Sequence, residues 1–506
     1  MNLKRVKAWE VVGVAAALTG LACSELVAQF NRSFNNPVLS IGNRIIDFVP
    51  NFVKELVIRT FGVNDKIFLI SLIVILMIIL SAIVGKAFGV GNSKRGKIII
   101  LGMTSVAGIA SLFDANANIF HLLPTLTAGT VTLLTLQKYA AKIEYADMIG
   151  TDLSRRESLK FISFIGVAAV AATGFGRILR EQASVQVQRI KVILPKVLKP
   201  LPNPPLDPAL KIPGLSTLIT PNSEFYRIDT SLSIPNISLE TWKLRIDGMV
   251  ANPKEFTYKE LTSLPVFELD GTIACVSNEI GGNLVGNARW LGIRLDDLIR
   301  EAKPTAKADQ IMGYSVDGFS AGFPLAALDG RDAMIAIGMN GEALPADHGF
   351  PARIIVPGLY GYVSATKWLS RIELTRFDTK QGYWIPRGWS AQAPIKTASR
   401  IDTPKDGWRV KPGKNVIAGV AWAPTRGISR VEVRIGNLEW REATLGPEMA
   451  NTTWRQWWIY WSAASGRQAI SVRATDGTGE VQSEKRVSVS PNGAEGWHTV
   501  TVSITE

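Results

Sequence analysis

The sequence is poor in cysteine and histidine, with two cysteines and three histidines among 506 residues. Cys23 lies inside an apolar N-terminal segment, whereas Cys275 lies in the polar remainder of the chain, so we expect no disulfide between them. A transmembrane b-type haem usually needs paired histidines, and the apolar region contains only His121. We therefore expect no haem there and interpret His121 as part of a polar contact near Asn116 and Asn118.

The chain also has no segment in which basic and aromatic residues alternate in the manner of a nucleic-acid-binding module. Its net charge is nevertheless +13. Much of that charge lies in short clusters beside apolar segments, where it indicates membrane topology. We therefore predict no nucleic-acid partner.

Long hydrophobic runs are confined to the first 180 residues, and 47% of all residues are hydrophobic. Runs of this length are typical of transmembrane helices, and we expect about five of them. They are Trp9–Phe30, Lys66–Phe88, Ile98–Phe113, Ile119–Leu136 and Phe161–Leu179. Basic clusters precede the first, third and fifth runs, so all of these clusters can lie in the cytoplasm. An odd number of spans then places the remainder of the chain outside the cytoplasm, behind a multi-pass anchor in contact with membrane lipid.

Two shorter features accompany the predicted spans. Apolar residues recur at helical spacing between Pro50 and Phe61, which predicts an amphipathic helix at the membrane surface. The segment from Ser154 to Lys160 contains Arg155 and Arg156 and resembles a twin-arginine export signal, although Ser158 stands where that signal prefers a large apolar residue. Ordinary positive charge on the cytoplasmic side explains the two arginines equally well.

The rest of the chain divides by composition. Residues 181–215 form a proline-rich linker that we expect to be a stiff, extended stalk. In residues 216–400, short apolar runs alternate with turn signals and with helical segments near 258–264 and 295–302, which predicts an α+β domain. From residue 405 to 506 the helix signals disappear, and short strands predict a small immunoglobulin-like β-sandwich.

Cys275 stands in the run Thr-Ile-Ala-Cys-Val-Ser-Asn-Glu-Ile-Gly-Gly, where a strand-like stretch opens into a glycine loop. A free thiolate in such a loop can bind a soft metal. The alternative is inert packing, because most buried cysteines have no reactive role.

Four blocks of sequence together resemble the sulfite-oxidase family. They are residues 222–235, residues 272–290, the run from Asn340 to Arg353, and the run from Val356 to Trp368. They occur in the family's order, and the β-sandwich is similar to the dimerisation domain of the same family. The resemblance covers most of residues 216–506 and leaves the membrane region outside it.

This resemblance implies a molybdenum-molybdopterin cofactor in which Cys275 is the only protein ligand of the metal. It also implies that the phosphate and pterin of the cofactor need cations and hydrogen-bond donors. Residues that match the family's cofactor-binding positions, or lie beside them, are Asn222, Tyr226, Arg227, Ser315, His348, Arg353, Thr366 and Lys367. Cys275 and Arg227 are the candidate catalytic residues. For Arg289, a structural ion pair and a contact with the site are equally good explanations.

One departure from the family pattern concerns the substrate. Asn278 is followed by Glu279 and Ile280, where sulfite oxidases usually have a pair of arginines. This change argues against sulfite. We therefore predict an extracytoplasmic molybdenum oxidoreductase that transfers an oxygen atom or two electrons on a small-molecule substrate. The alternatives are a sulfoxide reductase and a cofactor-free, membrane-anchored binding module. Electrons would pass to a separate redox partner or a quinone, and the sandwich suggests a homodimer.

Overall fold

A computed structural model describes residues 3–31, 34–50, 53, 56, 57, 60, 61, 65–114, 117–148, 185–205 and 211–505. The predicted fifth span, the twin-arginine-like segment and most of the predicted amphipathic helix lie outside these residues. The chain forms two compact units. The helical unit comprises residues 1–187 and 230–236, and the sheet-rich unit comprises residues 188–229 and 237–506.

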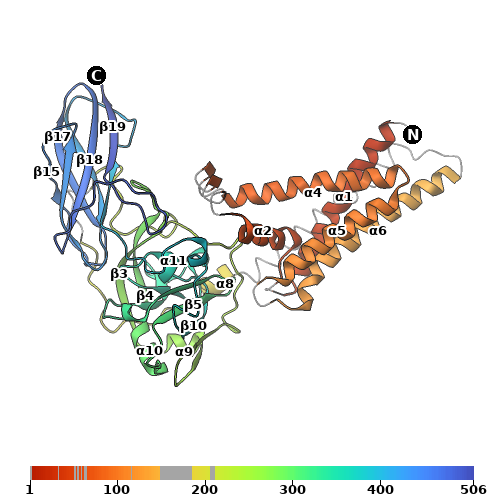
Figure 1. Ribbon diagram of the computed structural model, residues 1–506, viewed down its shortest axis with the longest axis horizontal. Coiled ribbons are helices and arrows are strands. Elements are labelled where there is room, and N and C mark those ends of the chain that lie inside the picture. Colours follow the sequence, from red (N-terminus) through yellow and green to blue (C-terminus); the bar gives the residue numbers. More distant parts are fainter. Residues whose placement is uncertain are drawn as a thin grey trace. The chain divides into compact units, whose positions relative to one another are not determined.

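The described part of the helical unit is built mainly from long helices (Figure 1). Its helices are α1 (Leu3–Ala28), α2 (Pro37–Phe48), α4 (Asp65–Gly89), α5 (Ser93–Leu112), the short η2 (Ile119–His121) and α6 (Leu122–Met148). Segments Ala8–Ala28, Asp65–Gly89, Ser93–Leu112 and Ile119–Ile143 are long and apolar enough to cross a membrane. The first four predicted spans are therefore confirmed as apolar helices of spanning length, and the third begins earlier than predicted. Helix α2 was not predicted.

Small residues bring α1 and α4 close together. A Cβ atom on Gly13 would lie 2.2 Å from the Ser81 carbonyl oxygen, and one on Gly85 would lie 2.0 Å from the Trp9 carbonyl oxygen. Close approach of this kind favours association of helices in a bilayer, where burial of apolar surface gains little. Trp9 then packs edge-on against Tyr139 of α6, with 5.0 Å between the ring centroids.

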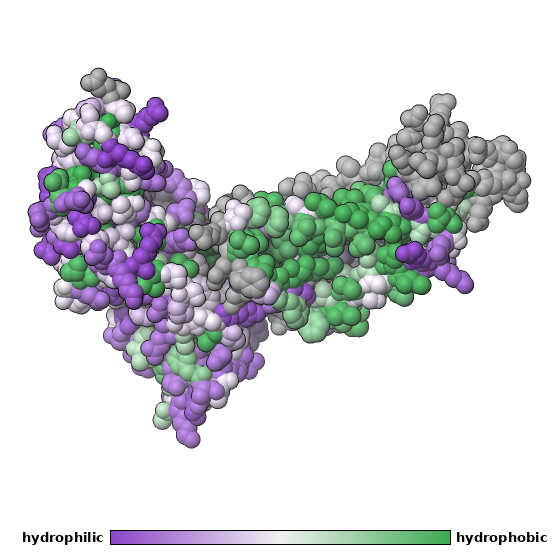
Figure 2. All heavy atoms as spheres, turned by 45° about the horizontal axis from the view of Figure 1, so that its top comes forward, coloured by the Kyte–Doolittle hydropathy of each residue, from purple (hydrophilic) through white to green (hydrophobic). Residues whose placement is uncertain are grey.

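The outer surface of the helical unit is strongly apolar. Figure 2 shows hydrophobic residues gathered along its helices, whereas the surface of the sheet-rich unit mixes polar and apolar residues. Ile67, Ile98 and Leu101 each expose more than 60% of their surface. A surface of this kind fits contact with lipid better than contact with water.

The first part of the sheet-rich unit contains two five-stranded sheets and short helices. The first sheet has the order β2 (Lys254–Thr257), β1 (Lys243–Gly248), β10 (Leu369–Thr375), β5 (Gln310–Ser315) and β6 (Ser320–Pro324). In the second, β3 (Val266–Ala274), β4 (Val285–Arg294), β7 (Met334–Met339) and β8 (Glu342–Ala343) follow in order, and β9 (Arg353–Ile355) also pairs with β7. The helices are α8 (Val185–Ile190), which straddles the boundary between the two units, α9 (Tyr258–Thr262), α10 (Leu295–Ala302) and α11 (Gly361–Ser364).

A β-sandwich forms the C-terminal part of this unit. One sheet has the order β11 (Ala398–Thr403), β13 (Gly413–Trp422), β17 (Arg455–Ala463) and β16 (Thr444–Leu445). The other has the order β12 (Arg409–Val410), β19 (His498–Ile504), β18 (Gly466–Asp476), β14 (Ile428–Ile435) and β15 (Arg441–Glu442). Apolar side chains from both sheets, including Trp457, Val431 and Val472, form one buried core. The sandwich itself is thus confirmed.

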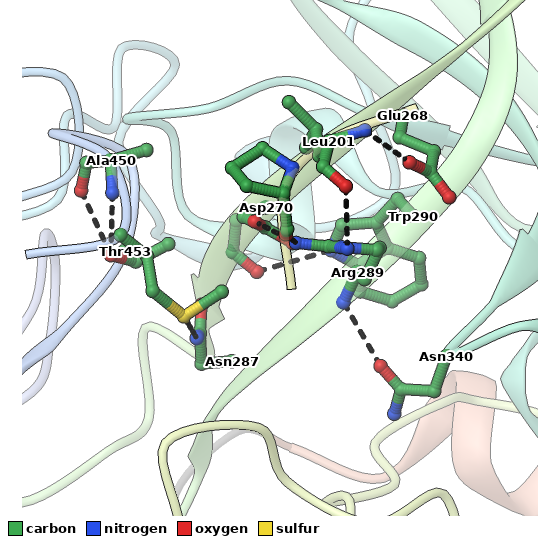
Figure 3. A network of polar contacts seen from close by, with 12 residues as sticks. Leu201, Glu268, Asp270, Asn287, Arg289, Trp290, Asn340, Ala450 and Thr453 are labelled. Atoms are coloured by element: carbon green, nitrogen blue, oxygen red, sulfur yellow. Dashed lines mark hydrogen bonds and ion pairs between the residues drawn. The ribbon is translucent and has the colours of Figure 1, made fainter. Parts of the chain in front are cut away.

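The described part of the proline-rich linker lies against the sheet-rich unit. Arg289 forms a two-point ion pair with Asp270 and also donates hydrogen bonds to the carbonyl groups of Leu201 and Pro202 (Figure 3). Glu268 accepts a hydrogen bond from the Leu201 N–H at 2.7 Å. Of the two explanations for Arg289, the structure therefore supports the structural ion pair. The linker is tied to the sheet at these residues and is not a free stalk there.

Candidate active site

Cys275 lies in the loop that closes the hairpin of β3 and β4. These strands pair along their full length, from Val266 opposite Ile293 to Ala274 opposite Val285. Loop residues 275–284 are held at both ends, since the Cys275 N–H donates to the Leu284 carbonyl at 2.9 Å and the Leu284 N–H donates to Asn278 Oδ1 at 2.8 Å. The position of the thiol is therefore set by a rigid hairpin.

The Cys275 side chain is buried and accepts one weak hydrogen bond, from the Ser277 N–H at 3.4 Å from Sγ. Burial raises the pKa of this thiol, because the charged thiolate loses its hydration, and the Ser277 contact offsets only part of that effect. A cation or metal ion at the sulfur would reverse this balance.

Arg353 begins β9 and is almost fully buried. Its Nη1 donates to the His348 carbonyl at 3.0 Å, and its guanidinium lies 5.3 Å from the centre of the Trp290 ring. Its Nε atom has no hydrogen-bond partner among the described residues. Burial lowers the pKa of Arg353 to about 10. A buried guanidinium with a free donor is suited to an anionic ligand.

Lys367 lies just before β10 and is paired with a buried carboxylate. Its Nζ atom is 2.7 Å from Asp229 Oδ2 and 3.1 Å from the Asp347 carbonyl oxygen. The same Asp229 oxygen lies 2.7 Å from Arg227 Nε. Burial lowers the pKa of Lys367 to about 8, although Asp229 acts in the opposite direction. Arg227 and Lys367 thus share one acidic partner.

His348 is held by the segment that contains Asn222. Its Nε2 atom lies 3.1 Å from the Asn222 carbonyl, which can only accept, so Nε2 carries a proton. Burial lowers the pKa of His348 to about 4, and the imidazole is neutral at pH 7. The Asn222 side chain donates to Glu342 at 2.7 Å and accepts from Asn340 at 2.8 Å. These contacts hold the segment in place.

Tyr226 lies close enough to Cys275 and Arg353 for both charges to affect its pKa. Burial is the main cause of its raised pKa, the Cys275 charge raises it further and the Arg353 charge opposes both. The phenol is therefore neutral at physiological pH and can act as a hydrogen-bond donor. The structure thus brings Cys275, Tyr226 and Arg353 together, with His348 beside the arginine.

The antiparallel pairing of β5 and β10 places Ser315 opposite Leu369, and therefore close to Thr366 and Lys367. The Ser315 hydroxyl accepts a weak hydrogen bond from the Asp317 N–H at 3.4 Å. Thr366 is fully buried, and its carbonyl accepts from the Ile354 N–H at 3.0 Å, which ties the two sheets together.

Two residues of the site were not predicted from sequence. Burial raises the pKa of Asp317, and the charges of Asp229 and Lys367 act on it in opposite directions, so it belongs to the same charged group. Tyr360 follows the Pro357-Gly358 turn, and burial raises its pKa to about 12, with the Cys275 charge among the smaller causes. The Pro-Gly turn was recognised as part of a family block, but nothing in the sequence indicated that the charge of Cys275 would affect the next tyrosine.

Comparisons with known proteins place these residues in a family. A model of the oxidoreductase molybdopterin binding domain matches residues 231–384. Mitochondrial sulfite oxidase of Rattus norvegicus is 28% identical over 342 residues, which cover 56% of this chain and 62% of that protein. Sulfite oxidase of Arabidopsis thaliana is 27% identical over 360 residues, covering 56% of this chain and 91% of the relative.

A bacterial relative is covered more fully than the rat protein, at similar identity. The uncharacterized oxidoreductase YuiH of Bacillus subtilis (strain 168) is 30% identical over 148 residues, or 29% of this chain and 72% of that protein. In fold, the chain is similar to the sulfane dehydrogenase SoxCD of Paracoccus pantotrophus, with a TM-score of 0.51, 22% identity and coverage of 58% and 85%. The chain spans about three fifths of the length of the rat protein.

These matches define the class, a molybdopterin-binding oxidoreductase. The chain belongs to the sulfite oxidase family and is an enzyme that uses the molybdenum-molybdopterin cofactor. The described residues fit this cofactor, because a free guanidinium donor at Arg353, a buried ammonium at Lys367 and a buried thiol at Cys275 lie in one unit. The cofactor-free binding module of the sequence analysis is accordingly disfavoured.

Proposed function

We propose that the chain is a membrane-anchored molybdenum oxidoreductase whose sheet-rich unit works outside the cytoplasm. Four apolar helices of spanning length support the anchor, and the predicted fifth span would carry the chain across the membrane a final time. The proposed domains remain 1–180, 181–215, 216–400 and 405–506. For the last of these we keep the prediction of an immunoglobulin-like, dimerisation-type sandwich.

Cys275 is proposed as the metal ligand. When bound, the molybdenum centre supplies two-electron oxygen-atom transfer, which no side chain of the protein can perform alone. The rigid hairpin loop fixes the sulfur, and the buried surroundings exclude water from it. The raised pKa of the free thiol means that the proton is released when the metal binds.

The buried cations are proposed to hold the cofactor. Arg353 and Lys367 would bind its phosphate, and the neutral His348 would donate from Nε2 after leaving the Asn222 carbonyl. Tyr226, Asn222, Ser315 and Thr366 would complete the wall of this pocket. The single observation that carries the proposal is the free, fully buried Nε donor of Arg353, because an orphaned donor of a charged group is costly unless a ligand satisfies it.

Arg227 is proposed to face the substrate. It is about one third exposed, whereas its partner Asp229 is buried. A partly exposed guanidinium can attract an oxygen-bearing substrate while remaining fixed by the carboxylate. Glu279, which is exposed in the Cys275 loop, adds negative charge near the site and disfavours a dianion such as sulfite. This charge supports the sulfoxide-reductase alternative, whose substrate is neutral.

The test is the molybdenum and pterin content of the full-length protein, produced in a host that makes and inserts the cofactor. We expect about one molybdenum atom and one pterin per chain in the wild type. Cys275→Ser should lose activity by at least about a hundredfold, because the metal loses its protein ligand. Cys23→Ser, the matched control, should keep both the cofactor content and the activity of the wild type. A wild-type protein without molybdenum or pterin would overturn the proposal.

A further inference from the structure

The helical unit contains a partly open, apolar cavity of about 360 Å³. Residues from α1, α2, α4, α5 and α6 line it, among them Leu21, Ile41, Met77 and Ala107. Its volume lies within the range of roughly 300–1,000 Å³ that is usual for small-molecule sites. A cavity with this lining suits the hydrocarbon part of a ligand that is dissolved in the bilayer.

One wall of the cavity carries a buried hydroxyl without a partner. Thr125 of α6 lines the cavity and is 2% exposed, and its Oγ1 has no hydrogen-bond partner among the described residues. Threonine in a helix normally satisfies its hydroxyl by bonding to the carbonyl four residues earlier. By contrast, Thr127 on the same helix makes that bond to the Leu123 carbonyl at 2.8 Å.

His121 ends η2, one turn before Thr125, and also has a polar atom that is unpaired among the described residues, although it is not one of the residues that line the cavity. Residues four apart on a helix lie on the same face. The Asn118 N–H donates to His121 Nδ1 at 3.1 Å, so Nδ1 is the acceptor and the neutral ring carries its proton on Nε2. Nδ1 also lies 3.2 Å from Asn118 Oδ1, which accepts from the Phe120 N–H. Because Nδ1 accepts from the Asn118 N–H, it carries no proton to donate to this oxygen. His121 Nε2 is buried, with no partner in the described part of the chain.

We propose that this cavity binds a prenyl quinone. Its ring carbonyl would accept from Thr125 Oγ1 at the cavity wall and from His121 Nε2 one turn away, and its tail would fill the apolar part. A phospholipid chain would leave both donors unused, because its polar head stays at the membrane surface. On the proposed topology, these donors lie at the extracytoplasmic end of the helices, the same side of the membrane as the catalytic unit.

The redox role of the quinone rests on the proposed function. Oxidation of a substrate with an oxygen atom from water releases two electrons and two protons, and one quinone that takes up both pairs becomes one quinol. In the reductase direction, one quinol returns the same two electrons and two protons. A quinone accepts both electrons at once and so needs no pair of haem histidines, which the described membrane region does not offer.

The experiment is photolabelling of the full-length protein in lipid nanodiscs with an azido-ubiquinone, followed by peptide mapping. We expect label on residues 100–135 that decylubiquinone displaces and added phosphatidylglycerol does not. In Thr125→Val, the concentration of decylubiquinone that displaces half of the label should rise about three- to tenfold, as expected for one lost hydrogen bond. Thr127→Val is the control on the same helix and should leave this concentration unchanged.

A second pair of variants separates binding from folding. His121→Phe should weaken the binding of decylubiquinone by a similar factor. His121→Gln, which keeps a hydrogen-bond donor, should bind decylubiquinone more tightly than His121→Phe does. Label that phosphatidylglycerol displaces equally well, or that is insensitive to Thr125→Val and His121→Phe, would overturn the quinone site. Molybdenum content is measured on the same samples. A loaded protein without specific label would refute this inference alone, and specific label without molybdenum would refute only the proposed enzyme.

Discussion

At the scale of single residues, the buried carboxylate of Asp229 is central to the site because it is within 2.7 Å of both Arg227 and Lys367. Asp229→Asn should leave Lys367 as a buried, uncompensated cation. We expect the free energy of unfolding of the sheet-rich unit to fall by about 3–5 kcal/mol, measured by urea denaturation. Asp378→Asn, which removes an exposed partner of Arg376, should change it by less than about 1 kcal/mol. Equal effects of the two substitutions would contradict this account.

The second prediction at this scale concerns His498, whose Nδ1 accepts from the Ile401 N–H at 3.0 Å. Burial lowers its pKa from 6.5 to about 4. The folded protein therefore binds this proton less readily than the unfolded chain. The resulting stability is complete above pH 6.5 and is lost as the pH falls toward 4.

We expect His498 to account for about 2 kcal/mol of the stability lost between pH 7 and pH 5. His498→Gln keeps an acceptor for Ile401 but cannot titrate, so its urea midpoint should depend less on pH than that of the wild type. Parallel pH profiles for the two proteins would show that His498 does not titrate with unfolding.

At the scale of elements, the loop between β3 and β4 is fitted against His498. Gly281 has φ +75°, and a Cβ atom there would lie 2.3 Å from the His498 ring. Gly407 has nearly the same φ, +76°, with open space around it. Gly281→Ala should therefore cost more than Gly407→Ala, for which we expect about 1 kcal/mol of backbone strain. The measurements are the urea midpoint and the molybdenum content. Only Gly281→Ala should lower the molybdenum content.

The elements also show how far the sequence could predict the structure. The helical segments expected near 258–264 and 295–302 are found as α9 and α10, because hydrophobic period and turn chemistry are local. Helix α2 was missed because it is short and precedes a segment with a stronger helical pattern. Asp317 and Tyr360 were missed because their approach to Lys367 and Cys275 depends on strand pairing between distant segments. The cavity beside Thr125 depends on the packing of five helices and could not be read from any one of them.

At the scale of the whole molecule, the two units should differ in their need for detergent. A chain that begins at Val185 lacks the four long apolar helices, and its Arg189 still bonds to the Ala343 and Leu344 carbonyls at 3.0 Å. We expect it to remain monodisperse without detergent, measured by size-exclusion chromatography with light scattering. Aggregation that detergent reverses would mean that residues 230–236, which belong to the helical unit, expose an apolar surface when that unit is removed.

The buried cations of the site have a consequence for the protein's supply in the cell. Arg353 and Lys367 lose hydration when the sheet-rich unit folds, and both have lowered pKa values. An anionic cofactor that binds only the folded state adds to stability in proportion to the logarithm of its concentration. Chains made during molybdenum starvation should therefore unfold more often and be degraded faster, so that the steady-state amount of this protein reports the availability of its cofactor.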